Sequence, residues 1–332
     1  MAATLRDVAS AAGVSVKTAS NVINDRPHVK PATRAKVEAA VRELGYRPNL
    51  TARGLKYGRS GFLALAIPQI DMPYFAELAM HFTDAASEAG YVLLLDVTRA
   101  DVEMERALLQ GVAPLKVDGL IFSPLRVTAE EISQRSDSTP LVLLGERAVP
   151  VGHDHVALDS VAAARAMTEH LLSIHKRRIA VIGYESAEGT ASVRLRGFHA
   201  ALDAAGLPHV PEYEVGVGQY ERYEGKAAME RLLALPTRPD AVFCFNDLMA
   251  IGALQACREA GVRVPDEIAI AGFDNIAETK YCSPALTTVA PDLDVLARES
   301  IRLLVGRITG SRTDAESVEV PWEIHVRAST VG

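Results

Sequence analysis

From residue 61 onward, short apolar runs alternate with longer stretches in which apolar residues recur at helical spacing. Short apolar runs are typical of strands buried on both faces, and the stretches between them are long enough for helices. Because two parallel strands need a crossover helix between them, this order predicts parallel sheets flanked by helices. We expect strands at 62–67, 91–97, 119–123, 141–144, 179–183, 241–245 and 268–272, and helices near 74–89, 101–112, 159–173, 191–205, 223–234, 246–260 and 292–306.

Polar and aromatic side chains follow the ends of these expected strands. The first four strands and the next three form two successive groups, which predicts two α/β lobes. Ligands of parallel sheets bind outside the carboxyl ends of the strands, so we expect a site in the cleft between the lobes. Carboxylate, amide and guanidinium groups can bind adjacent hydroxyls while aromatic rings pack on C–H faces, which suits a polyol. The candidates are Asp71, Tyr74, Phe75, Ser123, Thr190, Arg194, Tyr220, Asn246, Asp247 and Asp274.

Some of these candidates also have a purely structural interpretation. Asn246 or Asp247 could cap the helix that follows them. Asp274 could be a turn residue in the sequence Phe-Asp-Asn, and Phe75 could belong to the core or to the lobe interface. The residues alone leave these alternatives open, and they do not separate a sugar from a nucleobase as the ligand.

The first 45 residues have the pattern of three short helices. Thr4 and Asp7 form a capping-box pair, Gly13 ends the first helix and Ser15 can cap the second, which predicts a helix-turn-helix. A third helix begins at Pro31 and ends at Gly45. The side chains expected to pack between the helices are Leu5, Val8, Ala9, Ala12, Ala19, Val22, Ile23, Val37, Val41 and Leu44.

The charge of the chain is unevenly distributed. Residues 1–60 carry 11 Lys and Arg but 4 Asp and Glu, whereas the whole chain carries 35 and 42. A basic head on an acidic body favours a module that binds nucleic acid. On the second helix, Val16 can meet a thymine methyl group, Lys17 can donate to guanine and Asn21 can pair with adenine. The alternative is a three-helix domain that binds protein and leaves these side chains in solvent.

The segments TLRDVASAAGVSVKTASNVIN and GYRPNLTARGLK resemble the opening and the hinge of the LacI/GalR family of bacterial transcriptional repressors, and the likeness continues more loosely to the C-terminus. The resemblance implies a dimer that reads a palindromic operator of two half-sites. It also implies a two-lobed, periplasmic-binding-protein-like body that closes on a small molecule. Among the candidates, Arg194 and Asp274 match family positions that contact the effector.

The resemblance also implies domain boundaries. Residues 1–48 form the helix-turn-helix domain, 49–60 the hinge, and 61–332 the effector-binding and dimerisation domain. The chain then crosses between the lobes about three times. The first lobe holds about 61–160 and 291–318, and the second about 161–290 and 319–330, with the last strand, near VEVPWEIHV, in the second lobe.

Leu55 is an isolated large apolar residue in a basic, glycine-containing segment. Asn49 could cap a short helix from Leu50 to Lys56, which is too short to be stable alone. The resemblance implies that Leu55 enters the DNA minor groove as a wedge; the alternative is packing on the first lobe. The full set expected to contact DNA is Thr4, Ser15, Val16, Lys17, Thr18, Ser20, Asn21, Asn24, Ala52, Arg53, Leu55 and Lys56.

Motifs of catalysis and of cofactor binding are missing from the sequence. It holds no GxxxxGK[ST] phosphate loop and no GxSxG elbow, and GVGQYE lacks the third glycine of a dinucleotide fingerprint. The three cysteines have no CxxC spacing, and His153 and His155 are interpreted as parts of a solvent-exposed loop rather than metal ligands. We therefore expect no enzyme, cofactor or metal. The chain also has no secretory signal and no apolar run long enough for a transmembrane helix, which predicts a cytoplasmic protein.

The sequence thus predicts a DNA-binding transcriptional regulator, most simply a repressor, that acts as a homodimer. A small-molecule effector, expected to be a sugar or sugar derivative, would control its affinity for the operator. Two alternatives stay open. A solute-binding protein of a sugar uptake system would need an export signal, and a DNA-linked sugar-modifying enzyme would need a nucleotide-phosphate loop.

Overall fold

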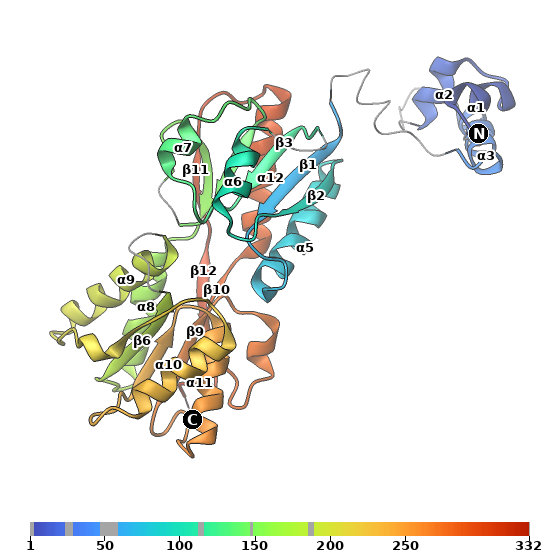
Figure 1. Ribbon diagram of the computed structural model, residues 1–332. Coiled ribbons are helices and arrows are strands. Elements are labelled where there is room, and N and C mark those ends of the chain that lie inside the picture. Colours follow the sequence, from blue (N-terminus) through green and yellow to red (C-terminus); the bar gives the residue numbers. More distant parts are fainter. Residues whose placement is uncertain are drawn as a thin grey trace. The chain divides into compact units, whose positions relative to one another are not determined.

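The computed structural model describes residues 3–23, 29–46, 59–111, 116–146, 149–184 and 189–331. The chain divides into two compact units, Met1–Gly61 and Phe62–Gly332, and each is described by itself (Figure 1). Asn24, Ala52, Arg53, Leu55 and Lys56 lie outside the described residues, as does the expected hinge helix. In the part of the chain that is described, no helix is both long enough and apolar enough to cross a membrane.

The smaller unit consists of three helices, α1 (Leu5–Ala11), α2 (Val16–Ile23) and α3 (Pro31–Glu43). The capping box forms as expected, since the Thr4 hydroxyl accepts from the Asp7 N–H and the Asp7 carboxylate accepts from the Thr4 N–H. Val8, Ala19 and Val37, one from each helix, are fully buried at the centre.

One residue expected in the core of this unit lies outside it. Leu44 is 38% exposed, and Ala40 takes the buried position one turn earlier. Because α3 ends at Glu43, Leu44 is its C-cap and lies beyond the stretch of α3 that packs on α1 and α2.

The first lobe of the larger unit is a parallel sheet covered by helices on both faces. Its strands lie in the order β11-β5-β4-β3-β1-β2. Helices α5 and α12 pack on one face and α6 and α7 on the other, with Phe82 and Phe122 buried in the two layers. The strands are β1 (Phe62–Ile67), β2 (Val92–Val97), β3 (Gly119–Phe122), β4 (Leu141–Leu144), β5 (Asp154–Ala157) and β11 (Ser317–Glu319), and the helices are α5 (Pro73–Glu88), α6 (Val102–Leu109), α7 (Ala129–Ser133) and α12 (Leu293–Thr309).

The second lobe repeats this plan around its own sheet, ordered β12-β10-β9-β8-β6-β7, in which only the β10–β12 pair is antiparallel among the described strands. Helix α8 packs with α9, and α10 with α11. The strands are β6 (Ile179–Tyr184), β7 (Glu214–Val217), β8 (Ala241–Cys244), β9 (Ala269–Phe273), β10 (Thr287–Pro291) and β12 (Trp322–His325), and the helices are α8 (Ser160–Ser173), α9 (Thr190–Ala204), α10 (Arg222–Leu233) and α11 (Asp247–Glu259), with short 3-10 turns at Pro211–Tyr213 and Ala277–Lys280.

This architecture confirms the predicted fold class, a small helical head followed by two lobes with mostly parallel sheets. All seven expected strands and all seven expected long helices are present within a few residues of their predicted bounds. The chain passes between the lobes after β5, after β10 and after β11.

Two sequence interpretations need correction. The segment 318–326 is two strands rather than one strand of the second lobe: β11 joins the first sheet and β12 the second. Pro321 lies between them, and because proline has no N–H it interrupts the ladder. His155 lies in strand β5 rather than in an exposed loop, between β4 and β11. The neighbouring carboxylate of Asp154 is fully buried because Arg307 and Arg312 pair with it at 2.7 and 3.4 Å.

Candidate functional site

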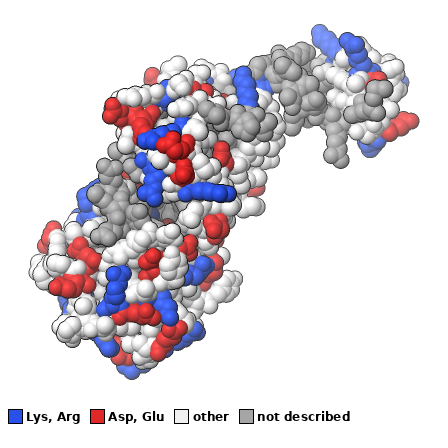
Figure 2. Space-filling view, in the orientation of Figure 1, with Lys and Arg blue, Asp and Glu red and all other residues white. Residues whose placement is uncertain are grey.

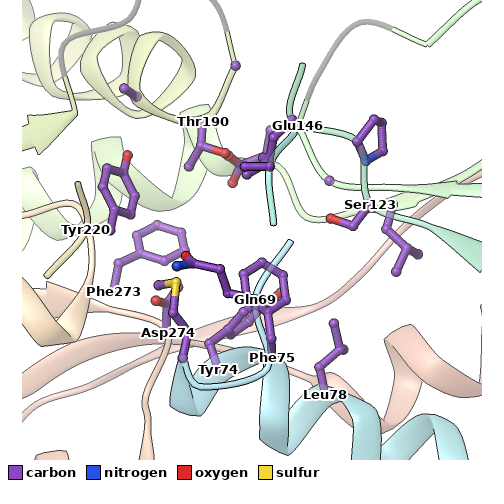
Figure 3. A pocket seen from close by; sticks show the side chains of 18 of the residues that line it. Gln69, Tyr74, Phe75, Leu78, Ser123, Glu146, Thr190, Tyr220, Phe273 and Asp274 are labelled. Atoms are coloured by element: carbon purple, nitrogen blue, oxygen red, sulfur yellow. The ribbon is translucent and has the colours of Figure 1, made fainter. Parts of the chain in front are cut away.

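A cavity of about 500 Å³ lies between the two lobes of the larger unit. The first lobe contributes the segments that follow β1, β2, β3 and β4, and the second contributes the start of α9, the segment after β7 and the end of β9. Figure 3 shows side chains from both lobes converging on this space. The polar and aromatic residues of its walls include Gln69, Tyr74, Phe75, Ser123, Glu146, Thr190, Arg194, Tyr220, Phe273 and Asp274.

The parallel sheets bring these residues together. Ser123 directly follows β3, Glu146 is the second residue after β4, and Asp274 directly follows β9. Since all three strands run in the same sense within their sheets, their carboxyl ends face the cleft. Thr190 and Arg194 reach it from the first turns of α9.

Arg194 is the centre of the charged part of the site. Its side chain is 8% exposed, and one guanidinium nitrogen lies 3.1 Å from Oε1 of Glu146, across the lobes. Another lies 3.8 Å from Oδ1 of Asp274 and donates to the carbonyl of Phe245. The guanidinium carbon stands 3.4 Å from the centre of the Phe273 ring, a cation–π arrangement. One cation therefore joins carboxylates of both lobes inside the cavity.

Two buried polar atoms of this group have no hydrogen-bond partner among the described residues: Oε2 of Glu146 and Nε of Arg194. Oε1 of Glu146 already accepts from the Ser160 hydroxyl and from Arg194. An unpaired buried acceptor or donor costs about 1–3 kcal/mol, so native structures rarely keep one without a reason. A hydroxyl group can both donate to a carboxylate and accept from a guanidinium, so it has the chemistry that these two atoms lack.

Burial and charge shift the titration of the site. Burial acts to lower the pKa of Arg194, but the carboxylates of Glu146 and Asp274 outweigh it and raise that pKa above its ordinary value. Burial raises the pKa of Asp274 to about 7, with Arg194 opposing and Glu146 and Glu77 adding to the rise. Burial, then Asp274 and Glu146, raise the pKa of Tyr74, so its hydroxyl stays protonated.

Seven of the predicted ligand residues line the cavity: Tyr74, Phe75, Ser123, Thr190, Arg194, Tyr220 and Asp274. The structural alternatives apply to two of them as well. Phe75 also packs beside a cluster of Met72, Leu248 and Ile276 that joins the lobes. Asp274 has a left-handed φ of 110°, as a turn residue would.

The other three predicted ligand residues lie outside the cavity walls. Asp71 is exposed to solvent. Asn246 caps α11, accepting from the Met249 N–H at 2.9 Å. Asp247 is fully buried and accepts from the Thr288 hydroxyl and the Ile276 N–H, at 2.6 and 3.0 Å. Asn246 and Asp247 thus hold the backbone next to the cavity, because their positions at a strand end serve the following helix and loop.

The sequence interpretation missed several lining residues, among them Glu146, Phe273, Arg99 and Arg126. Glu146 had an available signal, since a charged residue two positions after the apolar run LVLL stands where the other candidates stand. Phe273 looked like the last residue of a buried strand, and only the three-dimensional arrangement shows that Arg194 stacks on it.

The lobes also touch beside the cavity. The Ala277 N–H of the second lobe donates to Oε1 of Glu77 on α5, at 3.0 Å. Together with the cluster of Met72, Leu248 and Ile276, this contact closes one side of the cleft.

In the smaller unit, helix α2 presents its predicted polar face to solvent. Val16 is 44% exposed, although it is apolar. Thr4, Ser15 and Lys17 are exposed, and Thr18, Ser20 and Asn21 are half-buried. The Ser15 oxygen caps α2 by accepting from the Thr18 N–H at 3.0 Å.

Among the described residues, two buried cysteines and one histidine cluster are candidate groups for catalysis or metal binding. Burial raises the pKa of Cys244 and Cys257, so these thiols stay protonated and unreactive. His199, His209 and Glu214 lie close together on the second lobe. The two imidazole rings are stacked 4.1 Å apart, and each pairs with its own carboxylate, Glu214 or Asp203. Because ring nitrogens bind a metal in the plane of the ring, two stacked rings do not converge on one ion.

Comparisons with known proteins match both units. A family described as "Bacterial regulatory proteins, lacI family" matches residues 4–49, and one described as "Periplasmic binding protein-like domain" matches residues 168–330. The HTH-type transcriptional repressor PurR of Mannheimia succiniciproducens is 32% identical, over 98% of this chain and 98% of that protein.

Solved structures agree with this result. A complex of the transcriptional regulator CelR with cellobiose is 33% identical, with a TM-score of 0.74 and coverage of 98% of this chain and 99% of that one. The lac repressor dimer bound to operator and the anti-inducer ONPF is 26% identical, with a TM-score of 0.86 over the whole of both chains.

Proposed function

Because the chain belongs to the LacI family of bacterial regulatory proteins and is a DNA-binding transcriptional repressor of that family, we propose that a small polar effector bound between the lobes controls its hold on the operator. The effector class we favour is a sugar or sugar derivative. The relatives matched over nearly their whole length are named repressors or regulators, which favours this function over a transport protein or a sugar-modifying enzyme.

The group of Glu146, Arg194 and Asp274 carries the proposal. It brings two carboxylates and a guanidinium into the cavity and leaves one acceptor and one donor without partners among the described residues. Adjacent hydroxyls of a polyol could satisfy both atoms at once. Tyr74, Phe75 and Tyr220 supply aromatic surface for the apolar faces of the same molecule. The relative CelR is described in complex with cellobiose, which is consistent with a sugar in this cleft.

The location of the cavity suggests how the signal would arise. Glu146 belongs to the first lobe and Arg194 to the second, so a ligand that binds this pair has different contacts in open and closed arrangements of the lobes. A ligand can shift such an equilibrium only by its difference in affinity for the two states. Effector and operator would then be coupled, and the coupling is reciprocal.

The second of the two coupled binding sites is the DNA-binding head. We propose that α2 enters the major groove, where Val16, Lys17 and Asn21 meet base edges while Thr4, Ser15, Thr18, Ser20 and Asn24 contact the backbone or neighbouring bases. A homodimer would read two half-sites, in line with the lac repressor dimer on its operator. Ala52, Arg53, Leu55 and Lys56 would contact the minor groove at the centre, with Leu55 as the wedge.

Two linked experiments test this function. A DNA site is first selected from a random-sequence library with the full chain, and its affinity is measured by fluorescence anisotropy. The full chain is then screened by thermal shift against sugars, sugar derivatives and nucleobases, because a ligand that binds only the folded state raises the melting temperature. We expect a sugar derivative to stabilise the protein and to change operator affinity. Failure to select any specific DNA site, or stabilisation by nucleobases alone, would contradict the proposal.

A further inference from the structure

Two arginines, Arg99 and Arg126, line the first-lobe side of the cavity. Both are exposed. Unlike Arg194, neither arginine has a carboxylate within ion-pair distance in the part of the chain that the structure describes. The Arg126 side chain donates a hydrogen bond from Nε to the carbonyl of Ala100, at 3.1 Å. Figure 2 shows basic side chains beside the hollow between the lobes. Two cations that line the same cavity and have no carboxylate partner among the described residues favour an anionic ligand.

The backbone that carries these arginines is held in an unusual conformation. Arg99 and Ala100 are both left-handed, with φ of 55° and 52°. Two consecutive residues of this kind cost free energy, since their Cβ atoms crowd the backbone. Such strain persists where the surrounding structure fixes it, and the hydrogen bond from Arg126 to Ala100 ties the two segments together.

A buried carboxylate fixes the segment of Arg126. Glu105 on α6 is fully buried, and its two oxygens accept from the N–H groups of Leu125, Arg126 and Val127 at 2.9, 2.8 and 2.9 Å. Backbone donors satisfy the oxygens of Glu105, and the described contacts include no ion pair between Glu105 and the Arg126 guanidinium. The buried carboxylate of Glu105 therefore holds the backbone of residues 125–127, two of which line the cavity, in place.

Two carboxylates of the cavity come from different lobes: Glu146 follows β4 in the first lobe, and Asp274 follows β9 in the second. In Figure 3, Ser123, which begins the segment leading to Arg126, lies on the opposite side from Tyr220 and Asp274. Asp274 and Glu146 share Arg194, so one guanidinium pairs with two carboxylates there. Among the described residues, the cavity thus contains one guanidinium that is held by carboxylates, and two further guanidinium groups, of Arg99 and Arg126, that pair with no carboxylate.

We propose that the effector is a polyol that carries an oxyanion, a phosphate or a carboxylate, and that Arg99 and Arg126 bind this group. The guanidinium is suited to both anions because its N–H groups form paired hydrogen bonds to their oxygens. This inference rests on the proposed function and specifies the chemistry of its ligand.

Inorganic phosphate is the first probe, because it tests the two arginines without knowledge of the sugar. Thermal shift and isothermal titration calorimetry are run on the full-length wild type, on the Arg99→Gln/Arg126→Gln double variant, on Arg126→Lys and on a control, Arg165→Gln. Arg165 is an exposed arginine on α8 that pairs with Glu169, away from the cavity. Binding of neutral sugars is then compared with binding of their anionic derivatives: glucose with glucose 6-phosphate and with glucuronate, and ribose with ribose 5-phosphate.

We expect phosphate to stabilise the wild type and the control, and to bind the double variant about tenfold or more weaker, because hydrogen bonds to charged groups are strong. Arg126→Lys should keep part of the effect. The sugar phosphates and glucuronate then show which oxyanion is preferred, and we expect one of them to bind tighter than its neutral parent. Absence of a phosphate effect in the wild type, or an equal effect in the double variant, would overturn the inference. A neutral sugar that binds and alters operator affinity, while no anion does, would refute this inference and leave the proposed function intact.

Discussion

The carboxylate of Glu146, from the first lobe, lies 3.1 Å from the guanidinium of Arg194, from the second, and both side chains are more than nine-tenths buried. Ion pairs between lobes are common at exposed rims, where they contribute little. This pair instead lies inside the cavity, and within the described part of the chain each partner keeps one polar atom unpaired. The contact that joins the lobes is therefore also a contact that a ligand would complete.

Glu146→Gln should weaken effector binding about tenfold or more, because the neutral amide loses a charge-assisted acceptor for ligand hydroxyls. Calorimetry with the strongest ligand from the thermal-shift screen measures the change. Glu130→Gln, at an exposed position of α7, is the matched control. Equal effector affinity in both variants would mean that Glu146 only joins the lobes.

Arg194→Met should lower the free energy of unfolding of the larger unit by about 3–5 kcal/mol, since it leaves the buried carboxylates of Glu146 and Asp274 without their cation. Urea denaturation measures this loss. The control Arg165→Met removes an arginine whose side chain is 51% exposed, and we expect a change of about 0.5 kcal/mol or less. A loss for Arg194→Met as small as that of the control would show that the two carboxylates do not depend on Arg194.

Asp274→Asn should reduce the pH dependence of stability. The pKa of Asp274 is about 7 in the folded protein and near 3.8 in an unfolded chain. Between these values the folded state holds the extra proton, so stability falls as pH rises from about 4 to about 7. Asparagine does not titrate, and like aspartate it tolerates a left-handed φ.

Urea denaturation of wild type and Asp274→Asn at several pH values between 4 and 8 measures the difference. Burial, then the charge of Asp274, raises the pKa of Asp247, so the difference between the two proteins also includes the loss of this second contribution in the variant. The wild type should lose up to about 1.4 kcal/mol more per pH unit within the window than the variant. If the free energy of unfolding has the same pH dependence in both proteins, Asp274 does not titrate in this window.

Lys17→Ala should weaken specific operator binding by about 1–3 kcal/mol if Lys17 donates to a base, with no change in effector affinity. Lys36→Ala removes the same charge from an exposed position on α3 and controls for the net charge of the head. Anisotropy titrations against specific and scrambled DNA separate the two outcomes. Equal losses on both DNAs would assign Lys17 to the phosphate backbone instead.

The sequence was sufficient to predict the lobes because the central strands, such as β3, β4, β8 and β9, are buried on both faces and are continuous apolar runs. It was weaker where an element has few apolar residues. Strand β5, with the sequence DHVA, is held by a buried ion pair between Asp154 and Arg307, whose partners are far apart in sequence. Strands β7 and β10 were missed as well, since EVGV is short and TTVAP is half polar.

The sequence also predicted some residues of the candidate site and missed others. Residues directly after predicted strands, such as Ser123 and Asp274, were identified because parallel sheets place strand ends at the ligand. Asn246 and Asp247 follow the same rule but serve the backbone, and no local pattern separates the two uses. Arg99 and Arg126 were missed because their positions depend on a strained turn and on the buried Glu105, which only the fold brings together.

The most direct test of effector control is the operator affinity of the full chain with and without saturating effector, measured by fluorescence anisotropy on the selected DNA site. Reciprocal coupling predicts that the dissociation constant for DNA changes by about fivefold or more, and that saturating DNA changes the dissociation constant for the effector by the same factor. If a ligand occupies the cleft, as calorimetry reports, and both dissociation constants stay the same, the cleft does not control DNA binding.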